Sequence, residues 1–230
     1  MTPLVLIPGM MCDARLYGPQ IPALSARRPV LLAPCTEHDT IAALAAAILA
    51  VAPPRFALAG LSLGGIVAME ILRQAGERVE RLALLDTNPR AELPDVRERR
   101  TPQVARVAGG ALEAVMREDV MPSYLAKDSP GDILDLCLEM ALALGPQVFA
   151  NQSWALASRP DQETTLAAYR SPALVLMGAE DRLCPLDRHE LMHRLMPQSR
   201  LVVVQGAGHL PTLEKPERTT AELIRWLDDR

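Results

Sequence analysis

Aromatic side chains are scarce in this chain, at 3% of its 230 residues. We therefore do not expect a site that stacks a large aromatic ligand, and Met and Leu would have to form the walls of an apolar pocket. Basic residues are not in excess either, since 24 Lys and Arg face 28 Asp and Glu for a net charge of −4. This balance does not favour nucleic acid as a partner.

The four cysteines form no C-x-x-C pair and no spacing typical of metal ligands. We interpret them as buried free thiols, which are typical of a reducing compartment. The longest apolar run, residues 41–52, is too short to cross a bilayer. The N-terminal residues lack the basic and long apolar regions of a secretion signal. We therefore expect a cytoplasmic protein without a membrane partner.

Apolar strand-like segments alternate with helical segments in the first 89 residues and after residue 168. Strands are expected at 4–7, 29–33, 56–59, 81–85, 173–177 and 201–204, and helices at 41–51, 63–75, 186–195 and 216–227. This alternation predicts an α/β protein with a mostly parallel sheet of about six or more strands and helices on both faces.

Residues 90–168 contain no convincing strand. Apolar residues recur there at helical spacing, and prolines and glycines such as Gly145 and Pro146 interrupt them. We predict three to five short helices inserted between two strands of the sheet. The chain is thus divided into a core, 1–89 and 169–230, and a helical cap, 90–168. No internal repeat is evident.

The segment Gly60-Leu61-Ser62-Leu63-Gly64 fits G-x-S-x-G and lies between a predicted strand and a predicted helix. In this context the motif predicts a sharp turn that exposes a nucleophilic serine, with glycines where side chains would collide. The Leu63 N–H at the helix N-terminus would point toward an oxyanion. The alternative is a glycine-rich turn in which Ser62 only caps the helix.

A serine nucleophile needs an imidazole to take its proton and a carboxylate to orient that imidazole. Asp181 and His209 each follow a predicted strand, and the chain order Ser62…Asp181…His209 is the one expected with such a turn. Asp86 also follows a strand and is the alternative acid.

The chain resembles the α/β-hydrolase family. The resemblance covers both ends of the sheet core and is carried by residues 8–10 (Pro-Gly-Met), 60–65 (Gly-Leu-Ser-Leu-Gly-Gly), 178–185 (Gly-Ala-Glu-Asp to Pro) and 206–217 (Gly-Ala-Gly-His to Glu-Lys-Pro-Glu). It implies a carboxylesterase-like serine hydrolase that cleaves a small ester, thioester or related carbonyl substrate. It also implies no cofactor and no metal.

By position, the resemblance makes Ser62 the nucleophile, His209 the general base and then acid, and Asp181 the orienting acid. The backbone N–H groups of Leu63 and Met10 would bind the oxyanion. The family usually has His where this chain has Pro8, so the loop is expected to be held differently, with Met11 as the alternative donor.

Residues 189–193 read His-Glu-Leu-Met-His, a literal H-E-x-x-H. On a helix such histidines share a face and could bind zinc, with Glu214 or Glu217 as a third ligand. The charged neighbours instead favour a solvated surface helix.

Two other functions stay open: a C–C hydrolase, lyase or acyltransferase on the same scaffold, and a non-enzymatic binder with a vestigial triad. We expect a small-molecule acyl substrate as the only partner and either a monomer or a homodimer. The sequence does not identify the substrate.

Overall fold

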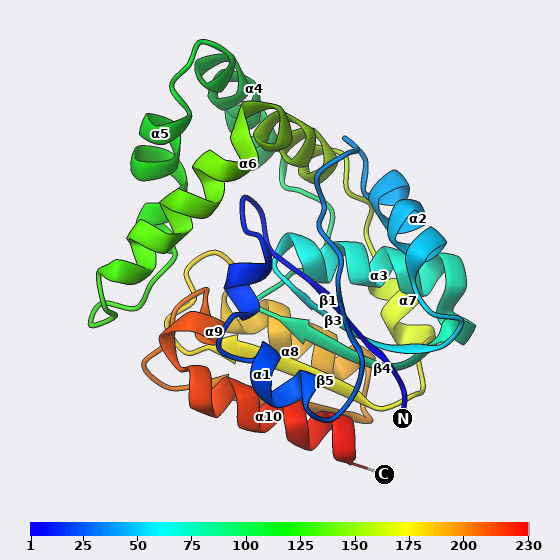
Figure 1. Cartoon of the computed structure of the whole chain (residues 1–230). Helices are drawn as coiled ribbons and strands as arrows, with labels where there is room; N and C mark the ends of the chain where they lie inside the picture. The colour runs from blue at the N-terminus through cyan, green and yellow to red at the C-terminus, as the bar shows by residue number, and fades with distance from the viewer. Residues whose placement is uncertain (230) are drawn as a thin grey trace.

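Six parallel strands form one sheet in the order β2-β1-β3-β4-β5-β6 in the computed structural model, which describes residues 1–229 (Figure 1). The strands are β1 (Leu4–Ile7), β2 (Val30–Leu32), β3 (Phe56–Leu61), β4 (Val79–Leu85), β5 (Ala173–Gly178) and β6 (Ser199–Val204). The prediction of a mostly parallel sheet of about six strands is confirmed.

Alternate residues of each strand face opposite layers of helices. Leu4, Leu6 and Leu61 belong to a core cluster with α1 (Ile21–Ser25), α10 (Pro216–Asp228) and the 3₁₀ turn η1 (Ala14–Tyr17). Val5, Ile7 and Leu58 belong to a second cluster with α2 (Ile41–Val51), α3 (Leu63–Ala75) and α8 (Leu186–Leu195). The expectation of helices on both faces is therefore confirmed.

The chain leaves the sheet after β4 and returns to it at β5. Helical elements fill this interval: α4 (Pro94–Ala108), α5 (Leu112–Val115), the π-turn η3 (Met116–Val120), the 3₁₀ turn η4 (Met121–Ser123), α6 (Asp132–Ala157) and α7 (Glu163–Ala168). We call these elements the inserted helices. Two further short elements lie in the rest of the chain: η2 (Gly76–Arg78) and α9 (Pro211–Glu214).

Helix α6 is bent at Gly145, whose φ of 84° and ψ of 175° are not helical. Pro146 follows and cannot continue the hydrogen bonding of the preceding turn. By length and composition α6 is the single helix among residues 1–229 that could span a membrane. Phe149, Gln152 and Ser153 of its second half are buried within the protein.

Strand β1 marks the point where the order of connection reverses, because β2 pairs with one side of β1 and β3 with the other. Open α/β sheets bind ligands beyond the carboxyl ends of strands at such a reversal. The loops after β1 and β3 therefore lie side by side, and a Cβ atom on Gly9 would lie 3.5 Å from Ser62 Cβ.

Candidate active site

Ser62 stands at the turn between β3 and α3. Its backbone angles, φ 55° and ψ −115°, lie in a region that non-glycine residues rarely adopt. A Cβ atom on Gly60 would lie 2.2 Å from Gly64 O, and one on Gly64 would lie 2.1 Å from Ile7 O. The predicted turn and its need for both glycines are confirmed. The Ser62 side chain makes no capping hydrogen bond to α3, so the alternative of a simple helix cap is wrong.

The last residue of β4 and a residue just beyond that strand support this turn. Ser62 N–H donates to Leu85 O at 2.9 Å, and Thr87 Oγ1 donates to Ser62 O at 2.7 Å. A Cβ atom on Gly65 would lie 2.6 Å from Thr87 Oγ1, so the third glycine of the motif makes room for this threonine. The backbone on either side of the Ser62 side chain is thereby fixed.

Two backbone N–H groups beside Ser62 are available to an oxyanion. Leu63 N–H begins α3, where the helix dipole is positive, and Met10 N–H lies in the loop after β1. Neither donates a hydrogen bond within the part of the chain that the structure describes. Met11 N–H instead donates to Gln152 Oε1 at 2.8 Å, so Met11 is not a free donor.

Asp181 and His209 are in contact, as predicted. His209 Nδ1 lies 2.9 Å from Asp181 Oδ2, and the two residues are only 3% and 6% exposed. Asp181 Oδ1 accepts the N–H groups of Leu183 and Cys184 at 2.8 and 3.0 Å. Burial acts to raise the pKa of Asp181, but His209 and these N–H groups outweigh it and lower that pKa below its ordinary value.

The other ring nitrogen of His209, Nε2, has no hydrogen-bond partner among residues 1–229. It is therefore free to accept a proton. Ser62 as a whole residue is partly exposed. No hydrogen bond joins Ser62 Oγ to His209 in the described residues, and that contact stays a prediction.

Asp86, the alternative acid, does not contact the imidazole through a hydrogen bond. It is completely buried, with φ 43°, and its Oδ1 accepts Gly178 N–H at 2.8 Å. Asp86 Oδ2 has no donor among the described residues. Burial raises the pKa of Asp86 well above its ordinary value, and the nearby Asp181 carboxylate raises it further. Both effects favour the protonated form of Asp86 over the carboxylate.

Glu214 holds the loop that carries His209. Its carboxylate is 7% exposed and accepts Gly208 N–H at 2.9 Å and Leu210 N–H at 3.0 Å. These two donors flank His209 in the sequence. A carboxylate that accepts backbone N–H groups on both sides fixes the course of the loop and thus the direction of the imidazole.

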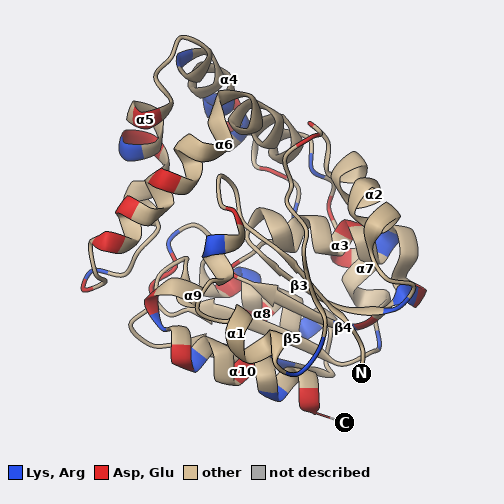
Figure 2. Ribbon diagram, viewed as in Figure 1, with Lys and Arg blue, Asp and Glu red and all other residues tan. Residues whose placement is uncertain are grey.

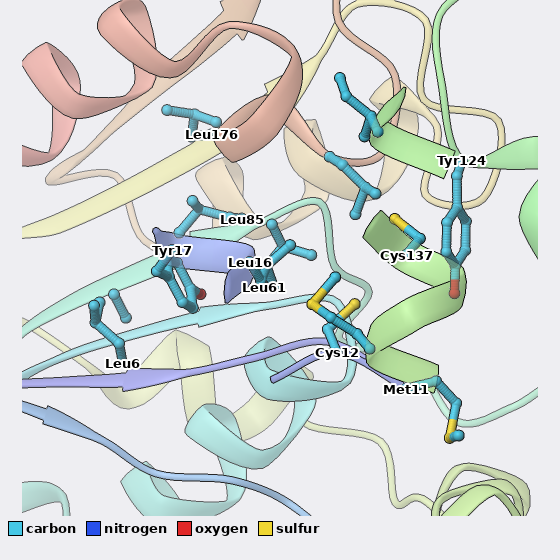
Figure 3. Packing of buried hydrophobic residues seen from close by; sticks show 14 of the residues in the cluster. Leu6, Met11, Cys12, Leu16, Tyr17, Leu61, Leu85, Tyr124, Cys137 and Leu176 are labelled. Carbon is cyan, nitrogen blue, oxygen red and sulfur yellow. The ribbon is translucent and has the colours of Figure 1, made fainter. Parts of the chain in front are cut away.

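The inserted helices meet the same loop. Ala126 N–H and Ser129 Oγ donate to Glu214 at 2.8 and 2.6 Å. His209 N–H donates to Tyr124 O at 2.7 Å, and the two rings lie 6.0 Å apart between centroids. Tyr124, just after η4, and Cys137 of α6 belong to the same core cluster as Cys12 and Leu16 (Figure 3). The position of His209 therefore depends on the inserted helices as well as on the sheet.

The H-E-x-x-H segment does not form a pair of free imidazoles. His189 is completely buried, and its Nε2 accepts Thr87 N–H at 3.3 Å. His193 Nδ1 instead lies 2.8 Å from Ser199 Oγ. The expectation of a solvated helix is wrong at His189, because that face of α8 packs beneath the loop after β4. Burial lowers the pKa of His189 to about 4.

One group of possible metal ligands lies at the site itself. Asp181, Cys184 and His209 each offer an atom within 4.8 Å of the others. Asp181 and His209 already share a hydrogen bond, and burial raises the pKa of the Cys184 thiol well above its ordinary value. Two of the three groups are thus already engaged with each other.

Sequence reasoning missed two residues that shape the site. Glu214 lies in a segment that carried the family resemblance, yet it was considered there only as a metal ligand. Gln152 had no signal at all, because its contact with Met11 joins residues 141 positions apart. Periodicity and motifs do not identify an isolated side chain whose hydrogen-bond partner lies far away in the sequence.

The fold and this turn define a class of α/β enzymes with an exposed serine nucleophile. A profile of the alpha/beta hydrolase family matches residues 4–223. The chain belongs to the α/β-hydrolase family, and it is an enzyme.

Several characterised proteins are similar to the chain. A pimeloyl-[acyl-carrier protein] methyl ester esterase of Aromatoleum aromaticum is 27% identical, over 93% of each chain. The biotin biosynthesis bifunctional protein BioHC of Cellvibrio japonicus is 26% identical over 94% of this chain, which spans only 45% of that protein. Among solved structures, a thermophilic esterase from Thermogutta terrifontis has a TM-score of 0.89 and 29% identity, over 99% of this chain and 89% of its own.

Proposed function

We propose that the chain hydrolyses a small carboxylic ester through an acyl-enzyme on Ser62. The observation that carries the proposal is the strained serine at the N-terminus of α3, at the same edge of the sheet as the hydrogen-bonded Asp181–His209 pair. A serine with φ 55° costs conformational energy and is retained where the surrounding structure imposes it, typically at active sites. The similarity to esterases supports the same reaction.

In the first step Ser62 Oγ attacks the carbonyl carbon while His209 Nε2 takes the hydroxyl proton. The negative charge that develops on the carbonyl oxygen is stabilised by Leu63 N–H and Met10 N–H. His209 returns the proton to the leaving alcohol as the ester C–O bond breaks. Water then attacks the acyl-enzyme by the same route, and this releases the carboxylic acid and restores Ser62.

The charge of the inserted helices bears on the substrate. Residues 90–168 hold twelve Asp and Glu against eight Lys and Arg. Arg106 pairs with Glu118 and Asp119 there, and Arg117 pairs with Glu113. Figure 2 shows acidic residues along the outer side of α6. The net negative charge of this segment would repel an acidic carrier protein, so we propose a free small ester, not a carrier-bound one.

The proposal extends to the setting of the enzyme. We propose that it acts in the cytoplasm, alone or as a homodimer, without nucleic acid, membrane or cofactor. The four cysteines are free thiols, and Cys12, Cys35 and Cys137 are buried. This arrangement suits a reducing compartment.

The Ser62→Ala variant tests the proposal. We expect kcat/KM for p-nitrophenyl acetate or butyrate to fall by roughly 10⁶, with an unchanged melting temperature, because the nucleophile alone is removed. A fluorophosphonate should label wild-type Ser62 and leave the variant unlabelled. Near-normal hydrolysis by the variant would refute the assignment. Incorporation of ¹⁸O from solvent into the acid would separate hydrolysis from acyl transfer or elimination.

A further inference from the structure

The side chain of Gln152 joins two loops of the sheet core to α6. It is 1% exposed, its Oε1 accepts Met11 N–H at 2.8 Å, and its Nε2 donates to Cys35 O at 2.7 Å. One partner can only donate and the other can only accept, so the orientation of the amide is fixed. Gln152 lies after the bend of α6, in the half that packs on the core.

The loop that receives this contact is a tight turn under strain. Cys12 N–H donates to Gly9 O at 3.2 Å, which closes a turn of four residues. Met11 is the third residue of the turn and has φ 54°, a conformation that favours glycine. Such a conformation persists only where surrounding contacts impose it. The contact to Met11 N–H in this turn comes from the Gln152 side-chain amide.

This contact bears on the free donor beside it. Met11 N–H belongs to the peptide group that joins Met10 to Met11, so a bond to it fixes the backbone angles on the C-terminal side of Met10. Met10 N–H is then left unbonded, in the loop whose Gly9 borders Ser62. The chain has Pro8 before Gly9, and proline can supply no N–H or polar side chain to hold the loop.

We propose that Gln152 is a positioning residue that holds the oxyanion-binding turn from α6, so that the inserted helices set part of the catalytic geometry. The inference rests on the proposed function, because it takes Met10 N–H as an oxyanion donor. A purely structural Gln152 would anchor α6 to the core without affecting the turnover rate.

The neighbouring residue provides a matched control. Asn151 Nδ2 donates to Thr36 O at 3.0 Å, so it also ties α6 to the loop after β2, but it does not contact the turn of Met10 and Met11. We would compare Gln152→Met, which keeps the length and removes both polar atoms, with Asn151→Ala. Gln152→Glu keeps an acceptor for Met11 N–H and serves as the conservative variant.

The readout is kcat and KM for p-nitrophenyl acetate, with inhibition by a trifluoromethyl ketone that forms a tetrahedral adduct. Loss of one oxyanion donor lowers kcat by roughly 10²–10³, so a displaced donor should lower it by about 10–100-fold in Gln152→Met. KM should change less than threefold. Affinity for the ketone should weaken in parallel with kcat/KM, and Gln152→Glu should lie closer to wild type.

Asn151→Ala should keep kcat within twofold. The inference is overturned if Gln152→Met keeps its kcat, if only its KM changes, or if Asn151→Ala loses as much. Hydrogen exchange of the wild-type protein gives an independent test that needs no variant: Met11 N–H should be protected and Met10 N–H should exchange freely. Equal, fast exchange at both amides would also overturn it.

Failure of this inference can be told from failure of the proposed function. If Ser62→Ala is inactive and Gln152→Met is normal, only the role of Gln152 is wrong. If Ser62→Ala keeps its activity, the proposed function is wrong whatever the Gln152 variants do.

Discussion

Asp86 and Asp181 are two buried carboxyl groups in neighbouring loops whose pKa values shift in opposite directions. Asp181 has His209 and two backbone N–H groups to stabilise its charge. Asp86 has one N–H donor and a negative neighbour, so its neutral form is favoured. When the environments of two carboxyl groups push their pKa values apart, the group with the lowered pKa is the one that acts as a carboxylate in the site.

We therefore predict different costs for the two amide variants. Asp181→Asn should lower kcat/KM by roughly 10⁴, because the imidazole loses the group that sets its tautomer and stabilises its charge. Asp86→Asn should lower it by less than about tenfold. Steady-state hydrolysis of a p-nitrophenyl ester measures both. Equal losses, or the reverse order, would make Asp86 the orienting acid.

Asp86 should also give the stability of the fold a distinct pH dependence. Its pKa is raised on folding, so between the unfolded value near 4 and the folded value the native state holds one more proton than the unfolded state. The free energy of unfolding must then fall as pH rises through that window, by at most about 1.4 kcal/mol per pH unit. Asp86→Asn should remove this fall. Urea denaturation of both proteins from pH 4 to pH 8 measures the difference, and parallel curves would contradict it.

At the scale of the elements, the β3–α3 turn and the loop after β1 press against each other. Gly64 approaches Ile7 O so closely that no side chain fits between them. This approach also brings Ser62 beside the loop that holds Met10. The same close packing thus places the strained serine next to the loop whose Met10 N–H we propose as an oxyanion donor.

Gly64→Ala is predicted to destabilise the protein by about 1–3 kcal/mol, since its Cβ would overlap a backbone oxygen. Gly131→Ala is the matched control, because a Cβ there meets nothing within 4 Å and the φ of −69° suits alanine. It should be neutral or stabilising by up to about 1 kcal/mol. Chemical denaturation compares the two. The packing argument fails if both substitutions have the same effect.

At the scale of the whole molecule, ion pairs join the segment before α4 to the segment between α6 and α7. The Glu92 side chain, 2% exposed, pairs with Arg100 of α4 and with Arg159 of the segment that follows α6. Arg159 Nε also donates to Arg90 O at 3.0 Å. The segment that precedes α4 is therefore joined to the segment between α6 and α7.

Glu92→Gln is predicted to lower the free energy of unfolding by about 3–5 kcal/mol, because it leaves two nearly buried guanidinium groups without their carboxylate. Asp95→Asn removes an ion pair to Arg99 whose side chains are 65% and 69% exposed, and should cost less than about 1 kcal/mol. Urea denaturation of both variants measures this difference. If Glu92→Gln lowers the free energy of unfolding no more than Asp95→Asn does, the buried ion pairs of Glu92 do not hold these segments together.

Much of the fold could be predicted from residue order alone. Strand 4–7 and helices 41–51, 63–75 and 186–195 lie where periodicity places them. The interruption predicted at Gly145 and Pro146 is present, since the non-helical backbone angles of Gly145 divide α6 into two helical halves. The division into a core and a cap at 90–168 stays a prediction. Local patterns locate elements well because hydrophobic spacing acts within one element.

The sequence by itself determined the parallel sheet and the serine turn, because both follow from short-range spacing of apolar residues and glycines. It also placed Asp181 and His209 after strands, and hence at one edge of the sheet. Only the tertiary structure decided that Asp181 and not Asp86 bonds His209, that Met11 N–H is occupied and that Glu214 holds the histidine loop. These choices depend on burial and on contacts between residues far apart in the chain, which no local pattern encodes.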